Sequence, residues 1–312
     1  MKRLRIVTVF VAVSLIGGCQ PSTSESSTSP ASVSAAIRPT DDQPATPSPA
    51  KVSLTVEPSS HGGEPGSGSG GRVRIGIKFD QPGLGFKDGN RYTGFDVAVA
   101  TYVVGKMGYK PDQIEWVQSP SKQRESMLKT GTVKMLFATY SITDKRKEEV
   151  SFAGPYFVGG QSVLVRSDSG IASVDGLAGK RVCSVTGSTS VDNLKKQQPA
   201  LVPQEYDTYS ACASALNDGV IDAMTTDDAI LAGYSNQAAY KGKFKLVGGT
   251  FSTEKYGVGL KKGDKDTCEK VNSAIKEMVS DGSWERALKE NLGDDYKYDT
   301  RENPPSTRET CA

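Results

Sequence analysis

The sequence predicts an α/β protein with two lobes, each built on a mainly parallel sheet with flanking helices. Three observations support this prediction. Residues 72–312 are a stretch of roughly 240 residues, which is enough for two cores of about a hundred residues each. Within it, short apolar strands alternate with helical segments, a pattern typical of parallel sheets covered by helices. The alternation also occurs twice along the chain.

The first series contains three strands and two helices. Its first strand carries an apolar residue at every second position, which places these residues on one face: Val73, Ile75, Ile77 and Phe79. The first helix is closed by a glycine, Gly108. In chain order, the elements are a strand at 72–79, a helix at 94–108, a strand at 114–117, a helix at 121–129 and a strand at 133–138.

The second series repeats this arrangement later in the chain. In chain order, its elements are a strand at 180–185, helices at 190–197 and 209–217, a strand at 220–225 and a helix at 227–234. Sheets of this kind bind ligands beyond the C-terminal ends of their strands. Polar residues at those ends are therefore the candidate site residues.

The N-terminus is typical of an export signal. Lys2, Arg3 and Arg5 precede an apolar run that is too short to span a bilayer permanently. The run ends in Leu-Ile-Gly-Gly before Cys19, which resembles the bacterial lipoprotein processing site. The resemblance implies a signal peptide at 1–18, cleavage before Cys19, and acylation of that cysteine as a membrane anchor. The alternative is a plain secretory signal followed by an incidental cysteine.

Residues 19–71 are predicted to be the acylated cysteine and a disordered tether. Ser, Pro, Thr, Ala and Gly dominate this segment, and its few apolar residues cannot offset the loss of chain entropy on folding. Gly66, Gly68 and Gly71 match the dinucleotide-binding pattern G-x-G-x-x-G. No strand precedes them, so we interpret them as linker.

Composition excludes several classes of function. The net charge of +2 gives no reason to expect a nucleic-acid-binding protein. The single histidine, His61, falls in a Gly/Pro/Ser-rich stretch, which leaves none for a catalytic triad or a zinc site. No P-loop motif is present. We expect no cofactor and no metal.

Four cysteines follow the tether, and an even number in an exported chain favours disulfides. Four cysteines permit three connectivities. We favour Cys183 with Cys212, because both lie in one series of strands and helices. We favour Cys268 with Cys311, because this pair would tie the C-terminus to a late helix. No C-x-x-C spacing points to metal or redox chemistry.

Two segments together carry a family resemblance: Ala-Thr-Tyr-Ser-Ile-Thr-Asp-Lys-Arg at 138–146 and Phe-Ala-Gly-Pro-Tyr at 152–156. They resemble the signature of the bacterial extracellular solute-binding proteins of polar amino-acid ABC importers. The resemblance covers residues 72–293 and implies a periplasmic-binding-protein-like fold with a hinge between two lobes. One lobe would hold residues 72–161 plus 252–312 and the other 162–251, with crossovers near 161–165 and 247–256.

In that family, a strand end and an arginine hold the ligand's α-carboxylate. The resemblance assigns the strand-end groups to Ala138, Thr139 and Ser141 and the arginine to Arg146. A planar guanidinium offers two parallel donors to a carboxylate, a more orienting contact than a lysine can make. The alternative for Arg146 is a solvated side chain in a charge-rich turn.

The second lobe supplies the other contacts that the resemblance implies. Ser188 and Thr189, at a helix start, resemble the family's second anion site. Asp227 resembles the aspartate that receives the α-ammonium group, which needs an acceptor of opposite charge once it is desolvated. Ordinary helix N-capping is the alternative for Ser188, Thr189 and Asp227.

Selectivity is predicted from two further cations. Lys78 stands where relatives that bind basic or neutral amino acids often carry an aspartate, and Ser121 with Arg124 resembles the Ser-x-x-Arg segment of glutamate/aspartate binders. Lys78, Arg124, Arg146 and Asp227 sum to +2 before any acidic neighbour that the sequence does not identify, which suits a ligand of net charge −1. The alternative for Lys78 is an exposed strand-end lysine. Which aromatic residue covers the ligand, Phe79 and Phe86 included, stays open.

The implied function is capture, not catalysis. The chain would be a monomeric, lipid-anchored receptor on the outer face of the cell membrane, closing on glutamate first, aspartate second, or their amides if Lys78 bonds a neutral carbonyl. It would deliver the ligand to the permease subunits of an ABC importer. A sensor that signals to a membrane partner is the first alternative, because it would use the same cleft. An enzyme on the same bilobal frame is the second, and it would need an additional general acid or base.

Overall fold

The structure, a computed structural model, describes residues 71–306 and Cys311. The predicted signal peptide at 1–18, the lipidation site Cys19 and the tether before Gly71 lie outside the described residues. Within the described part of the chain, none of the helices combines the length and the apolar character needed to cross a membrane.

The first lobe is built on a five-stranded sheet in the order β4-β1-β5-β12-β6. Its strands are β1 (Val73–Ile77), β4 (Ile114–Gln118), β5 (Met135–Leu136), β6 (Val150–Gly159) and β12 (Glu254–Lys261). β1 pairs in parallel with β4 and β5, whereas β12 runs antiparallel to β5 and β6. Four strands therefore share one direction, and β12 alone opposes them.

The second lobe repeats this plan in the order β9-β8-β10-β7-β11. Its strands are β7 (Gln161–Arg166), β8 (Val182–Val185), β9 (Gln204–Tyr206), β10 (Ala223–Asp227) and β11 (Phe244–Val247). β8 pairs in parallel with β9 and β10, and β7 runs antiparallel to β10 and β11. The prediction of two mainly parallel α/β lobes is confirmed.

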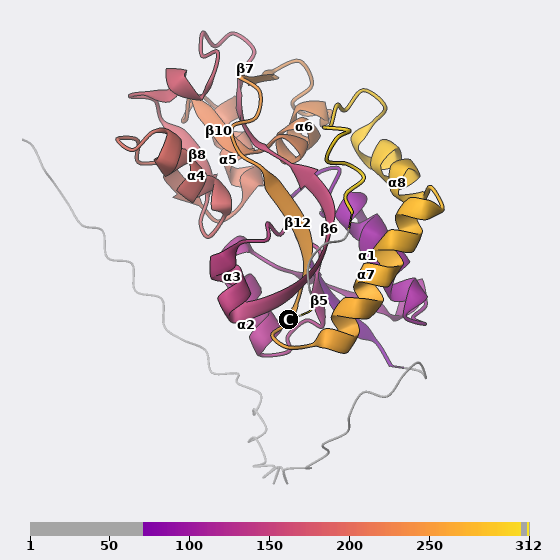
Figure 1. The fold of residues 1–312 in the computed structure, drawn as a ribbon. Helices are drawn as coiled ribbons and strands as arrows, with labels where there is room; N and C mark the ends of the chain where they lie inside the picture. Colours follow the sequence, from indigo (N-terminus) through magenta and orange to yellow (C-terminus); the bar gives the residue numbers. More distant parts are fainter. Residues whose placement is uncertain (1–70, 307–310, 312) are drawn as a thin grey trace, which may run out of the picture. The chain divides into compact units, whose positions relative to one another are not determined.

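Helices cover the two sheets (Figure 1). Those of the first lobe are α1 (Phe95–Lys106), α2 (Arg124–Lys129), α3 (Asp144–Glu149), α7 (Lys265–Ser280) and α8 (Ser283–Leu292). Those of the second lobe are α4 (Thr189–Gln197), α5 (Tyr209–Asn217) and α6 (Asp228–Asn236). Three short 3-10 turns, at Pro111–Gln113, Ser121–Gln123 and Val174–Leu177, and a hairpin of β2 (Phe86–Asp88) and β3 (Arg91–Thr93) complete the described fold.

An aromatic cluster forms the core of the first lobe beside α1. The ring of Phe95 packs at 5.7 Å from Trp284 of α8 and at 5.9 Å from Phe157 of β6. The indole N–H of Trp284 donates to the carbonyl of Tyr156 at 2.7 Å, so this buried polar group is satisfied. The cluster fixes β6 and both helices against each other.

Two chain crossings join the lobes and lie side by side (Figure 1). β6 passes through Gly160 directly into β7, and the chain returns between β11 and β12. Gln161 accepts a hydrogen bond from the amide of Phe251 at 2.8 Å and donates its own amide to Ser252 Oγ at 3.0 Å. A Cβ on Gly160 would lie 2.6 Å from the carbonyl oxygen of Ser252, so only glycine permits this approach.

Both favoured disulfides are present, with Cα–Cα distances of 5.8 Å for Cys183–Cys212 and 5.6 Å for Cys268–Cys311. The second fastens the C-terminal segment to α7. Asn303, within that segment, bonds both the amide and the carbonyl of Val158 in β6. Tyr296 donates to Asp228 of α6 at 3.2 Å, so the segment also contacts the second lobe.

Candidate ligand-binding site

A small cavity lies between the lobes, beyond the C-terminal ends of β4, β5, β8 and β10. Its volume is about 10 Å³, roughly the room that one water molecule needs, so the side chains that line it lie close together. The first lobe lines it with Ser121, Arg124, Thr139 and Ser141. The second lobe lines it with Ser188, Thr189, Ser190, Tyr209, Asp227 and Ile230.

Seven of the ten predicted ligand-binding residues therefore line this cavity: Ser121, Arg124, Thr139, Ser141, Ser188, Thr189 and Asp227. Lys78, Ala138 and Arg146 do not line it. The carbonyl of Ala138 accepts from Arg124 Nη1 at 2.9 Å, so Ala138 contacts a residue of the cavity wall without being part of that wall. Lys78 and Arg146 instead form ion pairs, Lys78 with Asp80 and Arg146 with Glu125.

Thr139 has a left-handed backbone, with φ of 46°. This conformation is strained for a β-branched residue and persists only where the surroundings impose it. The Thr139 amide donates to Asp96 Oδ2 at 3.1 Å, and its hydroxyl lies 3.1 Å from the amide nitrogen of Gln81. Tyr156 donates to the other oxygen of Asp96 at 2.7 Å. Burial raises the pKa of Asp96 to about 6, although both hydrogen bonds oppose the shift.

Arg124 begins α2 and is 3% exposed. Its guanidinium donates to the carbonyls of Ala138 and Ser121 and stacks 4.4 Å from the ring centre of Tyr140. Burial, and then the nearby charge of Arg146, lower its pKa to about 10, so it stays charged at neutral pH. None of the ion pairs in the described residues involves Arg124. Its charge therefore favours an anionic group in the cavity.

Asp227 is the last residue of β10 and is 3% exposed. Its Oδ2 accepts from the hydroxyl of Tyr256 at 2.7 Å, while its buried Oδ1 has no hydrogen-bond partner within residues 71–306 or at Cys311. It occupies the N-cap position of α6 but makes no capping bond, so the N-capping alternative is wrong. Burial raises its pKa well above the usual range, and the charge of Glu254 adds to this shift.

The N-terminus of α4 forms another part of the wall. Ser188 sits at its N-cap position and likewise makes no side-chain capping bond. Thr189 Oγ1 donates to Glu254 Oε2 at 3.0 Å and lies 3.3 Å from Ser141 Oγ of the first lobe. Ser190 donates to Thr226 at 3.2 Å. Hydroxyls from both lobes therefore meet at this helix end.

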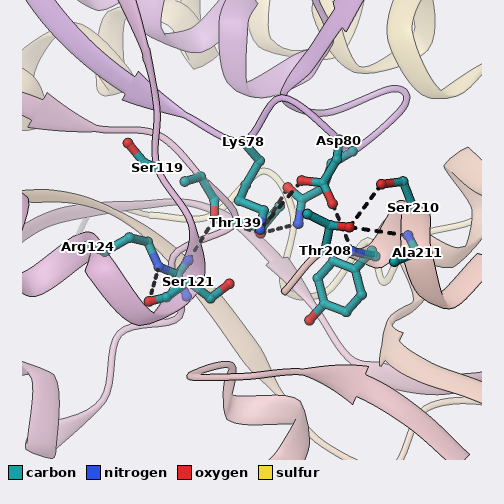
Figure 2. A network of polar contacts seen from close by, with 12 residues as sticks. Lys78, Asp80, Ser119, Ser121, Arg124, Thr139, Thr208, Ser210 and Ala211 are labelled. Carbon is teal, nitrogen blue, oxygen red and sulfur yellow. Dashed lines mark hydrogen bonds and ion pairs between the residues drawn. The ribbon is translucent and has the colours of Figure 1, made fainter. Parts of the chain in front are cut away.

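Lys78 is 2% exposed, so the alternative of an exposed strand-end lysine is wrong. Its ammonium lies 3.5 Å from Asp80 Oδ1 and 5.6 Å from the ring centre of Tyr209. Figure 2 shows Lys78 and Asp80 turned toward each other near Thr208, with Arg124 beside Ser121 in the same network. Burial lowers the pKa of Lys78, and Asp80 opposes that shift.

Arg146 is 8% exposed and is not the solvated side chain of the alternative interpretation. Its guanidinium donates to the carbonyl of Ser141 at 2.7 Å and to that of Gly187 at 3.2 Å, and pairs with Glu125 at 3.4 Å. It lines a second pocket, which shares Ser121, Ser188 and Thr189 with the cavity. Asp80 and Glu125 are acidic neighbours that the sequence did not identify, and they cancel the predicted charge of +2.

Tyr209, Ser190, Ile230 and Glu254 belong to the site but were not predicted. Tyr209 begins α5 shortly after β9, a strand that was not predicted, so the rule about strand ends could not find it. It supplies the aromatic ring of the cavity wall, while Phe79 packs on Tyr92 at 5.3 Å. Glu254 lies at the end of a chain crossing, where local sequence carries no signal. No metal-binding group of three His, Cys, Asp or Glu occurs within the described range.

Comparison with known proteins identifies the family of this chain. Residues 73–294 match the family model of bacterial extracellular solute-binding proteins, family 3. The glutamate-binding protein GluB of Corynebacterium glutamicum is 44% identical over 260 residues, which cover 79% of this chain and 88% of GluB. The glutamine-binding protein GlnH of Bacillus subtilis is 34% identical, covering 72% and 82%. Among solved structures, an ancestral arginine-binding protein bound to glutamine superposes with a TM-score of 0.67 at 33% identity, covering 72% of this chain and all of that one. This chain therefore belongs to the bacterial extracellular solute-binding proteins of family 3.

Proposed function

We propose that the protein is the membrane-anchored substrate-binding component of an ABC amino-acid importer, and that it captures glutamate between its lobes. Arg124 of the first lobe and the unpartnered Oδ1 of Asp227 in the second lobe carry this proposal. They face one cavity and have opposite charge. An amino acid, which carries a carboxylate and an ammonium group, would satisfy both.

The preference for an acidic amino acid rests on the relatives and on two cations near the cavity, Lys78 and Arg146, whose charges Asp80 and Glu125 balance in this structure. Arg124 has no ion-pair partner among the residues that the structure describes, whereas Lys78 and Arg146 are paired and do not line the cavity. A carboxylate that enters could exchange with Asp80 or Glu125 as their partner. GluB is a glutamate-binding protein and GlnH a glutamine-binding protein, which makes glutamate the first candidate and the amide the second.

Capture would proceed by closure of the hinge, because only the closed arrangement brings both lobes to the ligand. Direct contacts between the lobes support this arrangement. Lys122 pairs with Asp207 at 2.6 Å, and Asp80 Oδ2 accepts from the amide of Tyr209 at 2.8 Å. The closed protein would then dock on permease subunits.

A panel of amino acids tests the ligand. At a glutamate concentration of 100 times the Kd, mass action should add about 2.7 kcal/mol to the free energy of unfolding, which thermal unfolding of the full-length protein would detect. Aspartate and glutamine should give smaller shifts at the same concentration. Equal shifts for acidic and neutral amino acids would refute the acidic preference, and no shift with any amino acid would refute the function.

The membrane anchor is part of the proposal and is tested separately. Cys19→Ala should move the protein from the membrane fraction to the supernatant, because three acyl chains hold a protein stably and none remains in the variant. Mass spectrometry of the N-terminal peptide would identify the acylated residue. A variant that stays in the membrane fraction would contradict anchoring through Cys19.

A further inference from the structure

Glu254 is a buried carboxylate that contacts a residue of the cavity wall, Thr189, but does not line the cavity. It is the first residue of β12 and is 4% exposed. Its Oε1 accepts from Asn193 Nδ2 at 2.6 Å and from Ser252 Oγ at 2.9 Å, and its Oε2 accepts from Thr189 Oγ1 at 3.0 Å. All three partners are neutral, so none of them balances the negative charge of Glu254.

The contact with Glu254 fixes the direction of a chain of hydrogen bonds. A carboxylate can only accept, so the single hydroxyl proton of Thr189 points at Glu254. Ser141 Oγ lies 3.3 Å from Thr189 Oγ1 and must then be the donor of that pair. The order is Ser141 to Thr189 to Glu254. Both hydroxyls line the cavity, and both of their protons are used elsewhere.

The same strand also orients Asp227. Tyr256 lies two residues after Glu254, on the same side of β12, and donates to Asp227 Oδ2 at 2.7 Å. Asp227 Oδ1 is then the oxygen left without a partner. Ser141, Thr189 and Asp227 all line the cavity, and the oxygens of all three keep lone pairs that can accept a hydrogen bond. We refer to the part of the cavity that these three residues line as its acceptor end.

We infer that Glu254 is a positioning residue that makes the Ser141–Thr189 pair a hydrogen-bond acceptor, so that the acceptor end of the cavity requires an ammonium group. The inference rests on the proposed function and specifies it further. It also changes the predicted role of Thr189, because a hydroxyl held in this way would accept from the α-ammonium of the ligand instead of donating to its carboxylate. The charge of Glu254 near Asp227 strengthens the demand for a cation.

The test compares glutamate with glutarate, which has both carboxylates but no ammonium group. Calorimetry on the full-length protein would give both dissociation constants. In Glu254→Gln, the side-chain amide can donate to Thr189 and turn its proton toward the cavity. The affinity for glutamate should fall by roughly tenfold to hundredfold, as for a lost hydrogen bond to a charged group. The affinity for glutarate should stay the same or improve, so the preference for glutamate over glutarate should shrink.

Glu269→Gln is the matched control, because Glu269 is an exposed carboxylate of α7, a helix that contributes no residue to the cavity. It should retain both affinities. If Glu254→Gln lowers both affinities by the same factor, Glu254 is merely structural and the inference is overturned. If the wild-type protein binds no amino acid at all, the proposed function fails first, which is a different result.

Thr189→Val gives an independent measurement should Glu254→Gln not fold. It removes the hydroxyl but keeps the branched shape, and should also shrink the preference for glutamate over glutarate. In the Thr189→Val background, Glu254→Gln should change that preference no further, because the proposed effect passes through Thr189. A Thr189→Val variant that keeps the full preference would overturn the inference.

Discussion

Single buried charges dominate the behaviour of this site. Arg124 and Asp227 are each about 3% exposed, and the protein only partly compensates the ionised form of either side chain. Such groups reduce the stability of the protein without ligand, and they are the source of its binding free energy. A substitution that removes one of these buried charges should therefore raise the stability of the protein without ligand and lower its affinity for the ligand.

Asp227→Asn should show this separation. The affinity for glutamate should weaken by about 2–5 kcal/mol, the usual cost of removing one partner of a buried charge pair. The protein without ligand should become more stable, because a buried carboxyl with a strongly raised pKa is replaced by a neutral amide. Calorimetry and thermal unfolding would measure the two effects. Asp295→Asn, at an exposed position, should change neither, and a loss of both stability and affinity in Asp227→Asn would contradict this account.

Asp96 should make stability depend on pH. Its pKa is about 6 in the folded protein and near 3.8 when unfolded, so between these values the folded state binds more protons. The free energy of unfolding should therefore fall as pH rises from about 4 to 6, by up to about 3 kcal/mol from this group. Urea unfolding at several pH values should show a steeper fall in wild type than in Asp96→Asn. Parallel pH profiles for the two proteins would rule out this contribution.

At two positions, a glycine of the second lobe allows the backbones of the two lobes to approach closely. Gly187, just before α4, lies so close to the first lobe that a Cβ would be 2.7 Å from Lys122 Cα. Gly233, within α6, lies against Pro82, and a Cβ there would overlap the Pro82 carbonyl oxygen. The two positions differ in backbone, because Gly187 has a φ of 78° and Gly233 is helical. Gly233 therefore allows a substitution that disturbs closure without straining the backbone.

Gly233→Ala should raise stability and lower affinity together. Alanine favours a helix over glycine by about 0.5–1 kcal/mol, so the protein without ligand should unfold at a higher temperature. Contact with Pro82 should keep the lobes apart and weaken glutamate binding, with a larger radius of gyration by small-angle scattering at saturating ligand. Gly105→Ala in α1, with open space around its Cβ, should bring only the gain in stability. Unchanged affinity in Gly233→Ala would show that this contact does not limit closure.

Local patterns predicted most elements of both series, because apolar periodicity and glycine stops are short-range signals. Exceptions have local causes. The helix predicted at 121–129 begins with a 3-10 turn, and the strand predicted at 133–138 pairs only at β5, because the chain turns at Thr139. Several elements were not predicted: β2, β3, β6, β7, β9, β11, β12, α3 and α8. Near β6, β7 and β12 only the crossovers were predicted. The acidic partners Asp80, Glu125 and Glu254 could not be predicted, because their proximity depends on how strands and lobes pack.

For the molecule as a whole, the C-terminal segment acts as a third connection between the lobes. It is fastened to the first lobe by Cys268–Cys311 and by Asn303, and it reaches the second lobe through Tyr296. The disulfide closes a loop with a sequence separation of 43 residues. Its loss should therefore affect global stability.

Replacing both Cys268 and Cys311 with serine should lower the free energy of unfolding by about 2–4 kcal/mol, because the unfolded chain regains the entropy of that loop. Urea unfolding without reductant would measure the difference. Wild type treated with reductant should lose at least as much, since Cys183–Cys212 would open too. A double variant as stable as wild type would show that the segment is held without the disulfide.

The position of β12 also has a consequence for biogenesis. This strand lies between β5 and β6 in the sheet, yet it begins almost a hundred residues after the end of β6 and is therefore synthesised much later. The second sheet draws only on the continuous stretch 161–247, so it can assemble first, whereas the first sheet stays split until Lys261 has been synthesised. Long-range pairing of this kind is slow. The first lobe, although it comes first in the described chain, is therefore the second of the two lobes to complete its sheet.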